Sequence, residues 1–135
     1  MSHALLNYDG LCRNIHGHSY KLQITVKGEP ANEPGSPKDG MVIDFSILKK
    51  MVQEQIINQL DHSLMINENA PTDKLNALGE MYERHQVVPF QPTSENLVVY
   101  IAEKVKQLLP EHIELFCVRL FETGSSFAEW YAEDQ

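Results

Sequence analysis

The segment "HGHSYKLQITVK", from His16 to Lys27, constrains the fold most, because its side chains alternate with a period of two. Strict alternation over this length is typical of a β-strand with one buried face. One parity of the segment carries His16, His18, Tyr20, Leu22, Ile24 and Val26, and the other carries small or polar side chains. We therefore expect the two histidines to lie on the face of the strand that turns toward the core.

Two histidines on one strand face are suited to a metal ion. Alternate residues of a strand lie roughly 6–7 Å apart on the same face, so two imidazoles placed in this way can converge on one zinc with bonds of about 2.0–2.1 Å. The alternative is that one ring packs in the core and the other lies at the exposed end of the strand. A catalytic zinc usually takes three protein ligands, and spacing alone does not choose a third. The remaining histidines are His3, His62, His85 and His112.

The order of the expected elements predicts an α+β domain. Apolar residues recur at helical spacing in two later segments, and each segment begins at a residue suited to an N-cap. A strand, two helices and a hairpin favour an antiparallel sheet with both helices on one face. The expected elements are a loop over 28–40, a helix over 45–59 capped by Asp44, a short turn of helix near 73–83, a helix from Thr93 or Ser94 to Pro110, and a hairpin over 114–133 that turns near Gly124.

Composition narrows the class of protein. The 135 residues suit a single domain over 1–135. A net charge of −8 argues against duplex nucleic acid or a membrane surface as the partner. No apolar run approaches a membrane span, and no signal-peptide pattern is present at the N-terminus. Cys12 and Cys117 do not form a disulfide framework, and we expect a cytoplasmic protein.

Cys12 is a candidate for chemistry, whereas Cys117 fits a buried position in an apolar strand. Cys12 does not lie in an apolar strand; it lies beside Arg13 and four residues before His16. Positive charge from Arg13 and from a nearby dication favours the thiolate, which acts as a base or nucleophile. The residues alone leave open whether Cys12 is a base, a nucleophile or a zinc ligand.

Two further positions carry titratable side chains that invite a functional interpretation. Asp61 precedes His62, and a carboxylate that orients a histidine suits proton transfer, provided that the chain bends after the helix. Glu122 ends the apolar face of the hairpin's first strand. By contrast, "PTSEN" is fully explained by helix capping, with Glu95 favourable in the first turn. Without a family, these residues indicate a zinc-dependent hydrolase or lyase of unknown substrate.

Six stretches together resemble the 6-pyruvoyltetrahydropterin synthase family and its bacterial relative, 6-carboxytetrahydropterin synthase. They are "SHAL", "GLCRNIHGHSYKL", "MVIDFSILK", "LDHSLMIN", "PTSENL" and "LFETGSSFAEW", and the resemblance runs from residue 3 to the end. The three-residue spacer between Cys12 and His16 resembles the bacterial 6-carboxy type, since the animal enzymes tend to have a longer one. The segment 67–91 is longer than the link that the resemblance leads us to expect.

The resemblance implies a fold and a set of site residues. The fold is the tunnelling fold, an antiparallel four-stranded sheet with two helices on one face, whose subunits join into a barrel. A homo-oligomer, expected as a hexamer, would carry active sites at subunit interfaces. The implied residues are His3, His16 and His18 for Zn²⁺, Cys12, Asp61, His62 and Glu122 for catalysis, and Thr93, Glu95 and Glu122 for the pterin.

The implied reaction converts 7,8-dihydroneopterin triphosphate to 6-carboxy-5,6,7,8-tetrahydropterin, with release of triphosphate and acetaldehyde. Its product is a precursor of 7-deazapurines such as queuosine. One alternative within the family is triphosphate elimination that stops at 6-pyruvoyltetrahydropterin. Another is a non-catalytic family member that binds zinc as an interaction module. The complete set of Cys12, Asp61, His62 and Glu122 favours a catalytic protein.

Overall fold

The computed structural model describes residues 1–135 and contains an antiparallel sheet of three strands. These strands are β3 (Lys21–Lys27), β6 (Glu114–Phe121) and β7 (Phe127–Tyr131), in the order β3-β6-β7. In this register Leu22 lies opposite Leu120, and Ile24 lies opposite Val118. The alternation read from the sequence therefore does place Leu22 and Ile24 against the core cluster.

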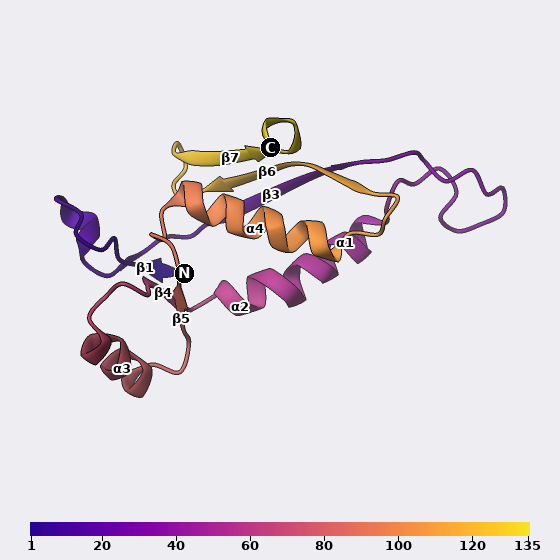
Figure 1. Ribbon diagram of the computed structural model, residues 1–135. Coiled ribbons are helices and arrows are strands. Elements are labelled where there is room, and N and C mark those ends of the chain that lie inside the picture. The colour runs from indigo at the N-terminus through magenta and orange to yellow at the C-terminus, as the bar shows by residue number, and fades with distance from the viewer.

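Two helical segments cover one face of this sheet, as expected for an α+β fold (Figure 1). One is α4 (Ser94–Leu108), whose N-cap Thr93 accepts a hydrogen bond from Asn96 N. The other runs without a break through α1 (Phe45–Val52), a π-helical turn (Gln53–Ile57) and α2 (Asn58–Leu60). Asp44 Oδ1 accepts from Ser46 N at 2.8 Å and caps its start. The buried residues of α4 that face the sheet are Leu97, Val98, Ile101, Ala102 and Val105.

A second, four-stranded sheet corrects the sequence prediction of a single antiparallel one. Its strands are β1 (Ser2–His3), β2 (His16–Gly17), β4 (Leu64–Asn67) and β5 (His85–Val88), in the order β2-β1-β4-β5. β1 pairs antiparallel with β2, but β1–β4 and β4–β5 are parallel. α3 (Thr72–Met81) precedes β5, so the expected helical turn near 73–83 is a helix of ten residues.

The predicted continuous strand from His16 to Lys27 is interrupted, and the two sheets explain why. β2 pairs with β1 in one sheet, whereas β3 pairs with β6 in the other. Residues 18–20 lie between the two ladders, and His18 N donates to Met1 O at 3.1 Å. One run of alternating residues therefore crosses from one sheet to the other, and His18 lies at the crossing.

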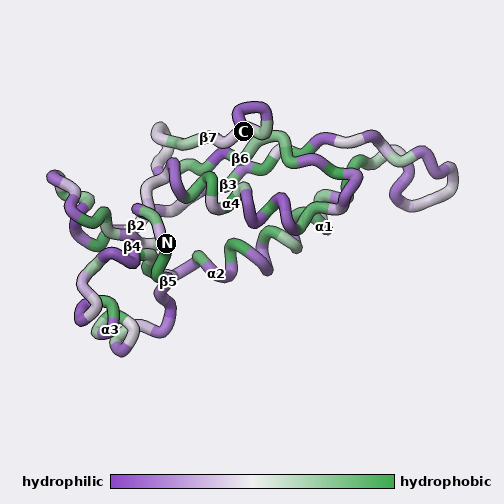
Figure 2. The backbone as a smooth tube through the Cα atoms, viewed as in Figure 1, coloured by the Kyte–Doolittle hydropathy of each residue, from purple (hydrophilic) through white to green (hydrophobic).

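The segment 28–43 projects away from the body of the molecule (Figure 1). Its tip is hydrophilic to neutral, whereas hydrophobic backbone gathers in the strands and helices of the body (Figure 2). Two short 3₁₀ helices, Leu11–Arg13 and Ala132–Asp134, complete the described elements. None of the helices combines the length and the apolar character that crossing a membrane requires.

Candidate metal centre

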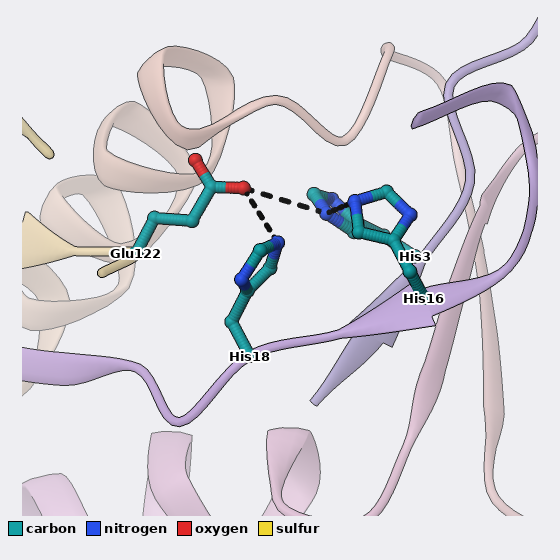
Figure 3. Close-up of side chains that lie close together, drawn as sticks. All are labelled: His3, His16, His18 and Glu122. Carbon is teal, nitrogen blue, oxygen red and sulfur yellow. Dashed lines mark hydrogen bonds and ion pairs between the residues drawn. The ribbon is translucent and has the colours of Figure 1, made fainter. Parts of the chain in front are cut away.

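Four side chains from separate segments converge where the two sheets meet (Figure 3). His3 comes from β1, His16 from β2, His18 from the crossing after β2, and Glu122 from the residue after β6. One possible ligand atom from each lies within 4.8 Å of the others. The register opposes His3 to His16, so the pairing of β1 with β2 brings a third histidine to the two that the sequence pattern placed together.

Hydrogen bonds fix the ring orientation of two of these histidines. His3 Nδ1 lies 2.6 Å from Pro92 O, and His16 Nδ1 lies 2.8 Å from Asn14 O. A carbonyl oxygen only accepts, so each Nδ1 carries the proton and each Nε2 presents a lone pair. The two Nε2 atoms lie 3.1 Å apart. Two lone pairs at this distance repel each other unless a proton or a cation lies between them.

The donor set fits zinc. Nitrogen ligands about 2.0–2.1 Å from a tetrahedral ion lie about 3.3 Å from each other, close to the separation of the two Nε2 atoms. An Nδ1–H that donates to a carbonyl is the usual outer partner of a metal-bound histidine. His18 Nε2 is buried and donates no hydrogen bond within the chain, so it is free to act as a metal ligand. It lies 2.9 Å from Glu122 Oε1, within ion-pair distance (Figure 3).

Burial keeps His3 in the form that binds metal. The residue is only 1% exposed, and desolvation lowers the pKa of its imidazole below the usual value. The hydrogen bond to Pro92 O opposes this shift, and the neighbouring His16 adds to it. A neutral imidazole is the form that ligates a metal.

Glu122 joins the cluster through one oxygen and is held through the other. Its Oε1 lies 3.6 Å from His3 Nε2 and 2.9 Å from His18 Nε2. Its Oε2 accepts a hydrogen bond from Ser94 Oγ at 2.7 Å. The sequence pattern indicates only a capping role for Ser94. The structure makes Thr93 the cap and turns the buried Ser94 toward the carboxylate. No local pattern signals this contact, because its partners lie 28 residues apart.

A pocket of about 460 Å³ extends from His18 to the end of α2. Its polar lining includes His18, Tyr20, Asp61 and His62, and its apolar wall comes from the helices and β3. The Tyr20 hydroxyl is buried without a partner. Burial, followed by the negative charge of Glu122, raises the pKa of this phenol. The pocket therefore brings the expected Asp–His pair and one metal-centre histidine to the same space.

Asp61 and His62 form the pair that the sequence suggested, and the required bend is present. Asp61 Oδ1 lies 3.0 Å from His62 Nδ1. Asp61 is the C-cap of α2 with extended backbone, and His62 has a φ of 55°. The left-handed conformation turns the chain sharply at the end of the helix. The side chain of His62 is 86% exposed.

Three other candidate residues lie outside the cluster of four. Cys12 is half-buried in the 3₁₀ helix Leu11–Arg13, and Leu5 N donates to its carbonyl oxygen at 2.9 Å. Thr93 caps α4, and Glu95 is exposed in the first turn of that helix. Neither lines the pocket, so the capping explanation describes both in this structure.

Comparison with known proteins gives a consistent result. A family model described as 6-pyruvoyl tetrahydropterin synthase matches residues 1–133. A Haemophilus influenzae protein named 6-carboxy-5,6,7,8-tetrahydropterin synthase is 34% identical over 96% of this chain and 91% of its own. A protein of the same name from Aquifex aeolicus is 33% identical over 90% of this chain and 76% of its own.

Two solved structures share the fold. The 6-pyruvoyl tetrahydropterin synthase of Caenorhabditis elegans superimposes with a TM-score of 0.64 at 25% identity, covering 97% of this chain and 87% of that one. An uncharacterized protein from Wolinella succinogenes superimposes with a TM-score of 0.74 at 23% identity, covering 97% of this chain and 92% of that one. The similarity extends over nearly the whole chain in both.

Proposed function

Since this chain belongs to the 6-pyruvoyl tetrahydropterin synthase family, we propose that it is a zinc-dependent lyase acting on 7,8-dihydroneopterin triphosphate. The proposed products are 6-carboxy-5,6,7,8-tetrahydropterin, triphosphate and acetaldehyde. Relatives that carry the 6-carboxy name at 33–34% identity support this branch. The observation that carries the proposal is the cluster of His3, His16, His18 and Glu122 beside a pocket that also holds Asp61 and His62.

In this proposal His3, His16 and His18 hold the zinc ion. A zinc ion held by these residues would polarise hydroxyl oxygens of the substrate side chain and acidify the adjacent C–H bond. The strands β1 and β2 carry His3 and His16, and the fixed Nδ1–H groups of these two residues orient their Nε2 lone pairs before binding. The neighbouring Glu122 places negative charge on the same site.

Glu122 and the pocket wall are proposed to bind the pterin. A carboxylate accepts two parallel hydrogen bonds from a ring N–H and an amino group, and apolar side chains pack on the ring face. Ser94 Oγ holds one carboxylate oxygen in a fixed direction. Thr93 and Glu95 were also expected to contact the pterin, and this remains a prediction from the resemblance.

Proton transfer is assigned to Cys12, Asp61 and His62. His62 Nδ1 lies 3.0 Å from Asp61 Oδ1 and is paired with that carboxylate, so His62 Nε2 is proposed as the nitrogen that exchanges a proton with a bound molecule. Cys12 is proposed to remove a substrate proton as a thiolate. The bond from Leu5 N to Cys12 O connects its 3₁₀ helix to the segment that follows His3.

We propose that the protein works as a cytoplasmic homo-oligomer, expected as a hexamer, with its active sites at subunit interfaces. Large apolar side chains exposed on the single chain support an interface, among them Leu11, Ile15, Met81 and Phe127. The product would serve 7-deazapurine synthesis, of which queuosine is an example.

The test is a product assay by mass spectrometry on zinc-loaded protein with 7,8-dihydroneopterin triphosphate. We expect 6-carboxytetrahydropterin and acetaldehyde in equal amounts. A 6-pyruvoyl product would assign the protein to the other branch of its family. Stoichiometric zinc with no turnover would reject catalysis and favour a zinc-binding interaction module.

A further inference from the structure

Arg84, on the segment between α3 and β5, binds the end of α2 through its guanidinium group. Its Nε donates to Asp61 O at 3.1 Å, and its Nη2 donates to the same oxygen at 2.8 Å. Nη2 also donates to Asn58 O. The last carbonyls of a helix have no intrahelical partners and carry partial negative charge, so a cation is favourable there. We propose that Arg84 is a positioning residue that sets the orientation of the Asp61–His62 pair, an inference that rests on the proposed function of that pair.

The oxygen that Arg84 binds belongs to the peptide group joining Asp61 to His62. Rotation of this peptide plane changes ψ of Asp61 and φ of His62 together. His62 holds a φ of 55°, a conformation that costs a residue with a side chain free energy and persists only where its surroundings enforce it. Two donors on one carbonyl oxygen restrain the plane. Arg84 therefore fixes the direction in which the His62 ring leaves the backbone.

The side chains of the pair receive little support of their own. His62 is 86% exposed and Asp61 is 61% exposed, and their partner in the structure is each other. Within the turn, Asp61 N donates to Ile57 O at 2.8 Å and Ser63 N donates to Leu60 O at 3.1 Å. These two bonds lie on either side of the Asp61–His62 peptide and do not involve its carbonyl oxygen. The side chain of Arg84 is therefore the group that restrains the orientation of this peptide plane.

Arg84 is itself held by the second sheet. Leu64 N donates to Arg84 O at 3.0 Å, and β5, which begins at the next residue, pairs with β4. In Figure 1, β5 lies beside β4 close to the end of α2. The segment 67–91, which is longer than the family resemblance leads us to expect, thus connects β5 to the turn that carries the proposed proton-transfer pair. This contact gives the segment a role in the site.

The variants that test this are Arg84→Ala, Arg84→Lys and the control Gln86→Ala. Gln86 Nε2 donates to Gln59 O at 2.9 Å, so the control removes a bond between the same segment and the same helix but leaves the Asp61 carbonyl untouched. We expect Arg84→Ala to lower kcat about tenfold while KM and zinc content stay near wild type. Arg84→Lys restores part of the rate, and Gln86→Ala changes it less than about twofold.

A double-mutant cycle separates positioning from general destabilisation. In a His62→Ala background, Arg84→Ala is expected to cause no further loss of kcat, because its effect passes through His62. An equal loss in both backgrounds would overturn the proposal.

Amide hydrogen exchange tests the same idea without turnover. We expect Arg84→Ala to accelerate exchange about tenfold at Asp61 and Ser63, whose amides donate hydrogen bonds in this turn, and Gln86→Ala to leave it unchanged. Unchanged exchange in Arg84→Ala would overturn the positioning role whatever the activity. Faster exchange in a protein whose wild type fails to turn over the pterin would retain the positioning role and reject the proposed function.

Discussion

The candidate metal centre and the Asp61–His62 turn are held in opposite ways, although both contribute residues to the same pocket. His3 is 1% exposed and its Nδ1 is fixed by Pro92 O. The side chain of His62 is 86% exposed and extends from a turn whose backbone, rather than its packing, sets its direction. A metal ligand must be fixed before the ion arrives. A group proposed to transfer protons, as His62 is here, must reach substrate and exchange with solvent, and the support of His62 comes through the main chain.

Removal of a buried ligand should have the largest effect. We expect His3→Ala to lose zinc and to reduce turnover by about 10³-fold or more, because the ion supplies several kcal/mol of charge stabilisation. The measurements are metal content by mass spectrometry and the product assay. The control is His112→Ala, an exposed histidine outside the cluster. Full zinc occupancy in His3→Ala would remove this residue from the ligand set.

His62→Ala tests whether the two regions are independent, because it should remove proton transfer and leave the fold and the metal ligands intact. We expect kcat to fall by about 10²-fold, the lower end of the usual contribution of a general acid or base. Zinc content and melting temperature should stay at wild-type values, since the side chain is exposed. Loss of zinc or of stability would show that the two regions are not independent.

Glu122→Gln keeps the shape of the side chain and removes its charge. We expect kcat/KM to fall about 10- to 100-fold, since a charge-assisted hydrogen bond to the pterin becomes a neutral one. Zinc affinity separates the two roles of Glu122. A loss of metal as large as that in His3→Ala would make the carboxylate primarily a ligand.

Ser94→Ala should have the smallest effect of the four. The loss of one hydrogen bond to a carboxylate is expected to lower kcat/KM a few-fold, equivalent to about 1 kcal/mol. Urea unfolding and the product assay on the same preparation measure both consequences. The cap of α4 should survive, because Thr93 provides it.

Local sequence patterns were sufficient to predict those parts of the site whose residues are close together in the chain. The period of two placed His16 and His18 together, and the Asp61–His62 sequence suggested a pair that the structure contains. The helices were predicted from their apolar spacing and caps, and the structure places both on one face of the antiparallel sheet, as the α+β prediction required.

Features that depend on pairing between strands distant in the sequence could not be predicted from local patterns. His3 reaches the site because β1 pairs with β2 and with β4, and a strand of two residues gives no periodic signal. Its assignment came from the family resemblance. The break at residues 18–20 was missed because alternation continues across it while the pairing partner changes. Ser94 was missed because a cap already explained the serine.

The projecting segment 28–43 separates the candidate site residues into two groups along the chain. His3, His16 and His18 precede it, whereas Glu122, Asp61 and His62 follow it. A cut in this loop would leave two fragments joined by the β3–β6 ladder and by the shared metal centre. Neither fragment alone would contain a complete site. The protein is therefore suited to fragment complementation, in which recovery of the proposed activity would show that the two fragments have associated.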